Sequence, residues 1–261
     1  MATMEEGGTY LYAVVPKAAG EEIGELSGVE DGKVYGIESG ELTAVVSDVP
    51  TQEELRPERR LLAAHQRVLD RVTDASPAVL PVAFGTVAES RAGVRELLER
   101  YQEDFSQQMK RVEGKIELGV RLTYQATKPN LFEFLIANSP ELRAERDRLA
   151  QSGRELTREE KIDLGQKVDA VLSALRDEYA ERIVQALGDL GADTKRNPPR
   201  NENELVNLVV LVPKDRRADF DAAIESMGPL FPDTFVIEQV GPFPPYDFVE
   251  MHLTAPAAGE A

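Results

Sequence analysis

The first half of the chain alternates short runs of aromatic and β-branched residues with amphipathic segments. Strands are predicted at TYLYAVV from Thr9, at KVYGI over 33–37 and at LTAVVS over 42–47, because such side chains fit a pleated, half-buried surface. ESGE, between the last two strands, is a plausible hairpin turn. This segment therefore begins with three strands.

A helix and a fourth strand complete this pattern. Apolar residues and His65 recur at helical spacing along one face, which predicts a helix from about Pro57 to Thr73. VLPVAFGTV, at 79–87, predicts a buried strand, and Pro81 places its entry near a sheet edge or an irregular first pair. The order is that of the split βαβ, or ferredoxin-like, fold, an antiparallel sheet with helices on one face.

A long helix that starts at the cap residue Ser90 keeps its apolar period to about residue 112, where we end the first domain, 1–112. KIELGVRLTY, over 115–124, then alternates without a break, which predicts a strand with one buried face and one wet face.

Residues 113–254 are predicted to form a second, α+β domain with a long helix. The helix follows a capping box made by Thr157 and Glu160 and extends for about thirty residues to Gly188 or Gly191. The tail 255–261 is predicted to be disordered. The other predicted elements are a short helix at 130–137, a charged helix or mobile flap at 141–155, a loop at 193–203, a strand at 205–212, a helix at 215–227, a strand at 234–240 and a final strand ending near Leu253.

GPFPPYDF, at 241–248, places three prolines among three aromatic residues. Prolines stiffen the backbone and hold the aromatic rings at defined angles. One interpretation is a strap between the 234–240 strand and the last strand, with Phe243 and Tyr246 packed on the core. The other is a docking element, because Pro242 and Pro245 satisfy the P-x-x-P pattern.

Charge narrows the class of partner. The chain has 30 basic and 47 acidic residues, a formal net charge of −17, so long-range electrostatics repel nucleic acid and anionic lipid. The absence of cysteine excludes disulfides and thiolate chemistry. No secretory signal is recognised at the start, and the longest apolar run, 205–213, is too short to span a bilayer. We expect a soluble cytoplasmic protein without nucleic-acid or membrane partners.

Candidate chemistry is sparse, and we predict no cofactor and no metal site. GVEDGKV, at 28–34, is a poor match to a phosphate-binding loop and places acidic residues where phosphate would lie. His65 is either a general base or a half-buried imidazole hydrogen-bonded to backbone, and His252 has the same two interpretations. The basic residues that could bind an anion, or simply be solvated, are Arg121, Arg143 and Arg200.

Several motifs, in this order along the chain, resemble the gas vesicle protein F and L family (GvpF/GvpL). They are YLYAVVP at 10–16, the helix with His65, LPVAFGTV at 80–87 and GPFPPYDF at 241–248. The sequence departs from the family pattern at Phe243, where tryptophan is frequent, and at Ala83, where arginine is frequent.

The resemblance implies a non-enzymatic accessory protein of gas vesicle formation, built from an N-terminal ferredoxin-like domain and a C-terminal α+β domain. It implies a cytoplasmic and gas vesicle location, with the shell protein GvpA and other accessory gas vesicle proteins as partners. The residues we single out for partner contact or interdomain packing are Phe84, Phe243 and Tyr246.

Two other functions are weighed against this one. One is an enzyme that uses His65 or an arginine at an anion site of the ferredoxin-like domain. The other is RNA binding on the first sheet, because RNA-recognition modules share this topology. The net charge of −17 and the lack of a basic, aromatic sheet motif disfavour RNA.

Overall fold

A computed structural model describes residues 7–20, 25–53, 55–126, 128–151, 153–191 and 193–251. The chain forms two compact units: unit 1 runs to Glu117 and resumes at Pro242, and unit 2 comprises Leu118–Gly241. Whether residues 1–112 and 113–254 are the two domains, as predicted, is not tested by this division and stays a prediction. The compact units assign residues 113–117 and the segment from Pro242 to unit 1 instead.

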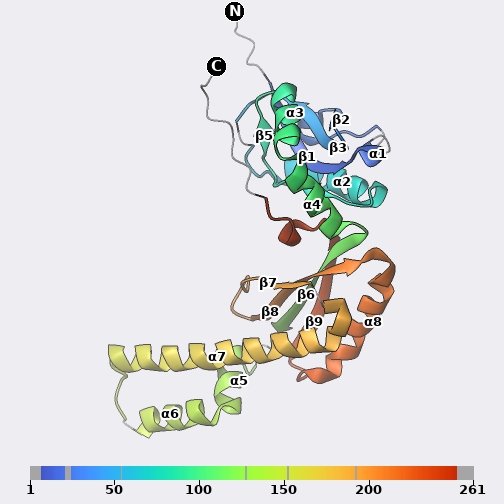
Figure 1. The fold of residues 1–261 in the computed structure, drawn as a ribbon. Helices are drawn as coiled ribbons and strands as arrows, with labels where there is room; N and C mark the ends of the chain where they lie inside the picture. The colour runs from blue at the N-terminus through green and yellow to red at the C-terminus, as the bar shows by residue number, and fades with distance from the viewer. Residues whose placement is uncertain are drawn as a thin grey trace, which may run out of the picture. The chain divides into compact units, whose positions relative to one another are not determined.

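Unit 1 is built on an antiparallel sheet with strand order β2-β3-β1-β4, and β5 also pairs with β1 (Figure 1). The three strands predicted first are confirmed, and a turn at Gly40 and Glu41 joins β2 to β3. Between β1 and β2 the chain forms a four-residue helix and a 3-10 turn. The elements are β1 (Gly8–Pro16), α1 (Lys17–Gly20), η1 (Val29–Asp31), β2 (Val34–Ser39), β3 (Leu42–Val49), β4 (Leu80–Pro81) and β5 (Val87–Ala88).

A bulge in β1 organises the core of unit 1. The register with β3 shifts between Leu11 and Ala13, so Tyr12 is the extra residue. Because a bulge re-aims the side chains beside it, Tyr12 and Ala13, although consecutive, both belong to the same core cluster. The helix α2 (Arg59–Ala75) supplies the other side of that cluster with its apolar face.

The long helix predicted from Ser90 is divided at Tyr101 into α3 (Arg91–Arg100) and α4 (Gln102–Val112). Ser90 caps it as predicted, accepting a hydrogen bond of 3.1 Å from the Gly93 N–H. These helices also pack on the sheet, and all residues of β1 from Gly8 to Val15 are buried. The strand order is that of the predicted pattern, but α1 is too short for its first crossover helix, so the ferredoxin-like assignment stays a prediction.

The strand predicted over 79–87 is largely wrong. Only Leu80–Pro81 and Val87–Ala88 are strands paired with β1. Between them, the Val82 N–H and the Thr86 carbonyl oxygen still bond to the backbone of β1, and Phe84 and Gly85 form a turn. Gly85, in this turn, has a φ of 91°, in the left-handed region that favours glycine.

The sheet of unit 2 has the order β7-β8-β6-β9. Burial in β6 differs from the prediction: Ile116 to Val120 are all buried, so alternation begins only after residue 120. The loop predicted at 193–203 contains β7, a short edge strand paired with β8. The strands are β6 (Lys115–Tyr124), β7 (Thr194–Arg196), β8 (Glu204–Pro213) and β9 (Phe235–Phe243).

The helices of unit 2 lie close to where the helical periodicity predicted them. The Thr157–Glu160 capping box is present, and the helix that it starts has 30 residues and ends at Gly188, which has a φ of 56°. Figure 1 shows its first part extending beyond the sheet, beside two shorter helices. The helices are α5 (Leu131–Asn138), α6 (Pro140–Gln151), α7 (Arg158–Leu187) and α8 (Arg217–Met227), with 3-10 turns η2 (Gly188–Gly191), η3 (Lys214–Arg216) and η4 (Gly228–Leu230).

The end of the chain differs from the prediction. After β9, which runs into GPFPPYDF, the chain forms the 3-10 turn η5 (Tyr246–Phe248), and residues 249–251 form no strand. The end of the predicted last strand, His252 and the tail 255–261 lie outside the described residues.

Candidate functional site

The carboxyl-terminal motif is anchored in unit 1 by its two adjacent prolines and its last aromatic residue. Pro244 and Pro245 are buried, and Phe248 is 1% exposed. Tyr246 differs, since 39% of its surface is exposed although its hydroxyl group points inward. One interpretation predicted a strap with Phe243 and Tyr246 packed on the core. The buried residues are Pro244, Pro245 and Phe248 instead, and the motif ends in a turn on unit 1 rather than in a strand.

A hydrogen-bonded chain joins this turn to β1 through His65. The Tyr246 hydroxyl lies 3.1 Å from Nε2 of His65, and the Tyr10 hydroxyl lies 2.9 Å from Nδ1. Tyr10 also accepts a hydrogen bond of 3.0 Å from the Gly85 N–H, and Tyr246 is 3.4 Å from the carbonyl oxygen of Val82. Both imidazole nitrogens are therefore engaged by phenols.

These contacts assign one tautomer to the imidazole of His65. If Nε2 carries the proton, it donates to Tyr246, which in turn donates to the Val82 carbonyl. Nδ1 then accepts from Tyr10, whose oxygen accepts from Gly85. The opposite tautomer would leave the Tyr10 proton without an acceptor in a buried site, which costs free energy. Every member is satisfied only when the imidazole is neutral.

Burial sets the charge of this cluster. Desolvation lowers the pKa of His65 to about 4 and raises the pKa of Tyr10 to about 12. Desolvation also raises the pKa of Tyr246, with smaller contributions from nearby Tyr10 and Glu117. An imidazole with both nitrogens occupied and so low a pKa is a poor general base at neutral pH. The arrangement is suited to holding the motif in place.

Aromatic rings surround the imidazole and place two of the three predicted site residues together. The ring of Tyr12 stacks on His65 with centroids 5.6 Å apart, and Phe84 meets it edge-on at 5.7 Å. Phe84 and Tyr246 thus share His65 as a neighbour. Phe243, half-buried at the end of β9, makes no ring contact with them within the described residues.

The turn has a second anchor that the sequence pattern missed. The backbone N–H of Asp247 donates a 2.8 Å hydrogen bond to Oε2 of Glu117, which is 3% exposed. Alternation along 115–124 assigned Glu117 to the wet face, so the pattern gave no sign of this role. Tyr10 was also missed, although a tyrosine in a buried strand usually finds a partner for its hydroxyl.

The other candidate residues lie elsewhere. Arg200 binds Oε1 of Glu204 through two nitrogens, at 3.1 and 3.0 Å, and Nε of Arg121 lies 3.8 Å from the same oxygen. Arg143 is exposed on α6. In GVEDGKV the chain forms η1, a turn in which Glu30 and Asp31 have positive φ. Among the described residues, no group of three or more His, Asp or Glu side chains is placed to hold a metal ion.

Comparison with known proteins agrees with this arrangement of motifs. Residues 8–250 match the family described as gas vesicle synthesis protein GvpL/GvpF. The chain belongs to this family.

Individual relatives extend the match. Gas vesicle protein F of Streptomyces sp. (strain CB03234) is 35% identical over 211 residues, which cover 80% of this chain and 84% of the relative. Crystal structures of GvpF from Anabaena sp. PCC7120 and Microcystis aeruginosa are similar in fold, each with a TM-score of 0.77 and 22% identity. The likeness covers 95% of this chain and 98% of the Anabaena protein, and 94% and 99% for the Microcystis protein.

Membership of the GvpL/GvpF family makes this a gas vesicle-associated protein with a mixed helix and sheet fold. Within the part of the chain that the structure describes, no helix has the length and apolar character needed to cross a bilayer.

Proposed function

We propose that this GvpL/GvpF-family protein is a non-enzymatic accessory factor of gas vesicle assembly. It binds the shell protein GvpA and other gas vesicle proteins as a chaperone, nucleation factor or minor component, in the cytoplasm and at the vesicle. The observation that carries the non-enzymatic part is the state of His65. Its two nitrogens are both hydrogen-bonded to tyrosines and its pKa is about 4.

Charge and surface support the binding role. A shell that excludes water on its gas side needs apolar subunits, and these expose apolar patches before they assemble. A chain with a net charge of −17 stays soluble while it covers such a patch, because like-charged complexes repel one another. The partly exposed rings of Phe84, Phe243 and Tyr246 are candidate contacts on unit 1.

The burial of β1 weighs against RNA binding on the first sheet. RNA-recognition modules need an open sheet face on which bases can stack. Here the residues of β1 from Gly8 to Val15 are buried, and α2 as well as α4 pack on the strand. We therefore do not retain RNA as a partner.

A pull-down of each gas vesicle protein by the full chain tests the proposal. We expect GvpA to be retained, and retention to fall at least about tenfold when an aromatic contact of this kind is truncated in Phe243→Ala. Phe243 is half-buried, so the thermal midpoint of the variant is measured beside the wild type. Failure of the wild-type chain to retain GvpA or any other gas vesicle protein would overturn the proposal.

A further inference from the structure

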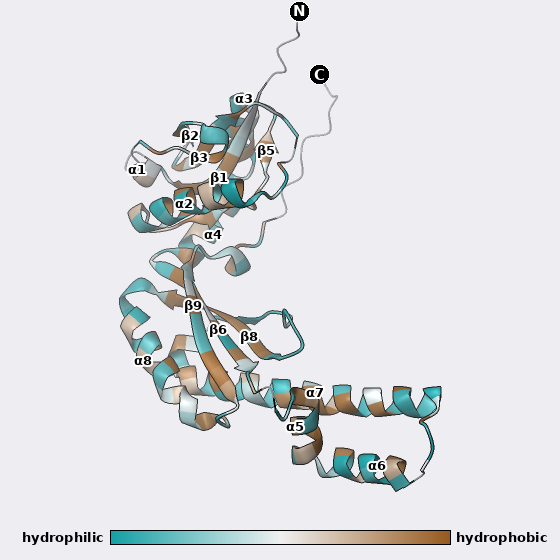
Figure 2. Ribbon diagram, turned by 180° about the vertical axis from the view of Figure 1, so that it is seen from behind, coloured by the Kyte–Doolittle hydropathy of each residue, from teal (hydrophilic) through white to brown (hydrophobic). Residues whose placement is uncertain are grey.

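The first two thirds of α7 expose an apolar stripe. Within this helix the buried residues are Tyr179, Ala180, Ile183 and Leu187, all of them in its last third. Before them, Gly165, Val168 and Leu172 lie on one side of the helix, at spacings of three, four and seven residues, and none of them is buried. Ile162 is 49% exposed. In Figure 2 this part of α7 shows brown and teal residues side by side.

Beside this stripe, α5 forms the second wall of a groove of about 590 Å³. Phe132, on α5, is 45% exposed. The remaining lining residues include Leu131 and Leu135 on α5, Val168 and Leu172 on α7, and Asn203 before β8. The lining residues that α5 and α7 contribute are thus mostly apolar.

Gly165 lies in the middle of this wall without an intramolecular reason. A Cβ built on it meets nothing within 4 Å, and its φ is not in the positive region. Glycine inside a helix is less stable than alanine, so a site with room for a side chain gains stability by having one. A glycine here leaves a flat place where the backbone of another chain can approach α7 closely.

Two acidic residues at the rim of the groove indicate that the partner chain is basic there. Asp169 and Glu202 both line the groove and are exposed. Neither carboxylate forms an ion pair with another residue among those described. Covering them with an apolar partner would desolvate two charges without compensation. A partner that fits must therefore bring basic groups to this edge.

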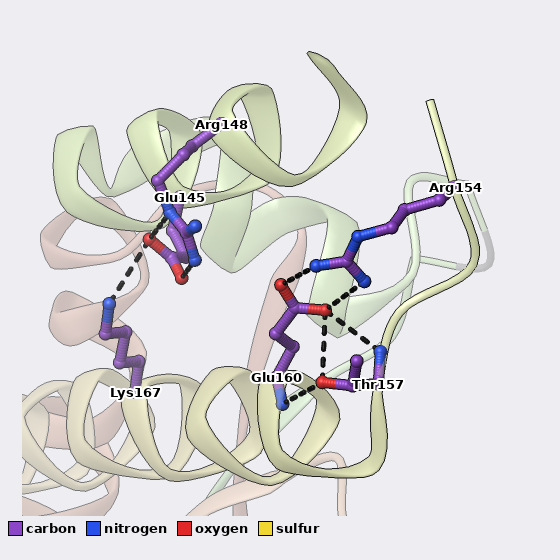
Figure 3. Close-up of polar contacts among 6 residues, drawn as sticks. All are labelled: Glu145, Arg148, Arg154, Thr157, Glu160 and Lys167. Carbon is purple, nitrogen blue, oxygen red and sulfur yellow. Dashed lines mark hydrogen bonds and ion pairs between the residues drawn. The ribbon is translucent and has the colours of Figure 1, made fainter. Parts of the chain in front are cut away.

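Polar contacts join α7 to α6 and to the segment that precedes α7. Lys167 on α7 lies 3.3 Å from Glu145 on α6, which also binds Arg148 at 2.7 Å (Figure 3). At the start of α7, Glu160 binds Arg154 at 2.7 Å and accepts a 2.9 Å hydrogen bond from the Thr157 N–H. These contacts join α6 and the segment before α7 to α7, and a surface that is ordered before binding loses less entropy when a partner binds.

We propose that the α5–α7 groove, defined by Phe132, Gly165, Val168, Asp169 and Leu172, binds an amphipathic helix of another protein. The occupant has small and apolar residues on one face and lysine or arginine at its edge. The distance from Gly165 to Leu172 is about 10 Å along the axis, which corresponds to about two turns of such a helix. A second copy of this chain, whose net charge is −17, fits the acidic rim poorly.

Fluorescence anisotropy on the full chain tests the proposal with two labelled peptides of about 18 residues, long enough to form helix. Both carry the same Leu/Ala face, one flanked by lysines and the other by glutamates. We expect the Lys-flanked peptide to bind and the Glu-flanked peptide to bind at least about tenfold more weakly. Equal affinity, or no binding of the Lys-flanked peptide, would overturn the proposal.

Substitutions locate the site. Gly165→Ala is expected to raise the thermal midpoint by about 2 °C while weakening the peptide, and Gly165→Leu to weaken it at least about tenfold. Ser173→Ala and Ser173→Leu are the matched controls, because Ser173 is exposed on α7 but does not line the groove. Asp169→Lys should reverse the preference between the two peptides. Unchanged affinity in the Gly165 variants would rule out this groove.

Sedimentation velocity of the chain alone identifies the competing occupant. A dimer that Gly165→Leu dissociates would make a second copy the occupant and overturn the proposal. This proposal and the proposed function can fail separately. If the peptide binds but GvpA does not, only the proposed function is affected. If GvpA binds the Gly165→Leu variant as well as wild type, GvpA uses another surface.

Discussion

The Tyr246 hydroxyl lies 3.1 Å from Nε2 of His65, a residue 181 positions earlier in the chain. This contact attaches the GPFPPYDF motif to unit 1, through His65 and Tyr10 of β1, and it requires a neutral imidazole. The predictions that follow from it concern stability, because the cluster has no free acid or base.

Tyr246→Phe should reduce the free energy of unfolding by about 1 kcal/mol, because it leaves the His65 Nε2–H without its acceptor. Denaturant titration measures the loss. Tyr35→Phe is the matched control: its hydroxyl binds Asp48 at the surface, where water replaces the lost bond, so its effect should be within about 0.5 kcal/mol. Equal effects of the two substitutions would contradict a structural role for the Tyr246 hydroxyl.

Acid should destabilise the protein through His65. The pKa of this imidazole is about 4 when folded and 6.5 when unfolded, so the unfolded chain binds more protons between these values. Stability is therefore highest above pH 6.5 and falls as pH is lowered towards 4, by at most about 1.4 kcal/mol per pH unit. The groups that face the ring are the phenols of Tyr10, Tyr12 and Tyr246, which stay protonated in this range.

His65→Gln separates this effect from the titration of carboxylates. The variant keeps a neutral polar group but has no proton to gain, so its stability should depend less on pH between 6.5 and 5. Denaturation at several pH values in this range compares the two slopes. If wild type and variant lose stability in parallel, the titrating group is not His65.

Thr157→Ala should loosen the start of α7. Its hydroxyl accepts a 3.3 Å hydrogen bond from the Glu160 N–H, and loss of such a cap costs about 1 kcal/mol. Because residues near Thr157 are exposed, we expect faster amide hydrogen exchange in the first turns of α7 and little change in global unfolding. Unaltered exchange at these amides would show that the capping box is dispensable. Ser173→Ala, in mid-helix, is the control.

Gly119→Ala should destabilise unit 2 at the pairing of β6 with β9. A Cβ at this position would lie 2.4 Å from Cγ2 of Val240, so the Val240 side chain or one of the strands has to shift. We expect a loss of about 1–3 kcal/mol in denaturant titration. The double substitution Gly119→Ala with Val240→Ala should recover part of it, and no recovery would place the strain elsewhere.

Periodicity predicted most helices and strands because it reports which face of an element is buried. It found β1, β8 and the full length of α7, including the capping box, since these follow from local pattern and cap chemistry. It failed where the burial of a residue depends on a partner far away in the sequence. Glu117 lies in the polar register of β6 yet is buried, because the Asp247 N–H supplies its hydrogen bond from 130 residues away.

Only the part of the candidate site that local motifs indicate could be predicted. Phe84, His65 and Tyr246 were singled out by type and motif, and the structure brings all three together. Their partner Tyr10 and the tautomer of His65 could not be inferred, because both depend on which strands meet across the core. Local pattern also could not separate the strand interpretation of 79–87 from a turn, since Gly85 reveals its φ of 91° only in three dimensions.

The discontinuity of unit 1 affects the order in which the protein can mature during synthesis. Domains usually fold as the chain emerges from the ribosome, amino-terminal part first. Here the acceptor for His65 Nε2 and the backbone donor for Glu117 belong to Tyr246 and Asp247, which are translated after unit 2. A nascent chain must therefore wait until unit 2 has been made before unit 1 is complete, and a chain truncated before Tyr246 lacks the protein partners of His65 Nε2 and Glu117.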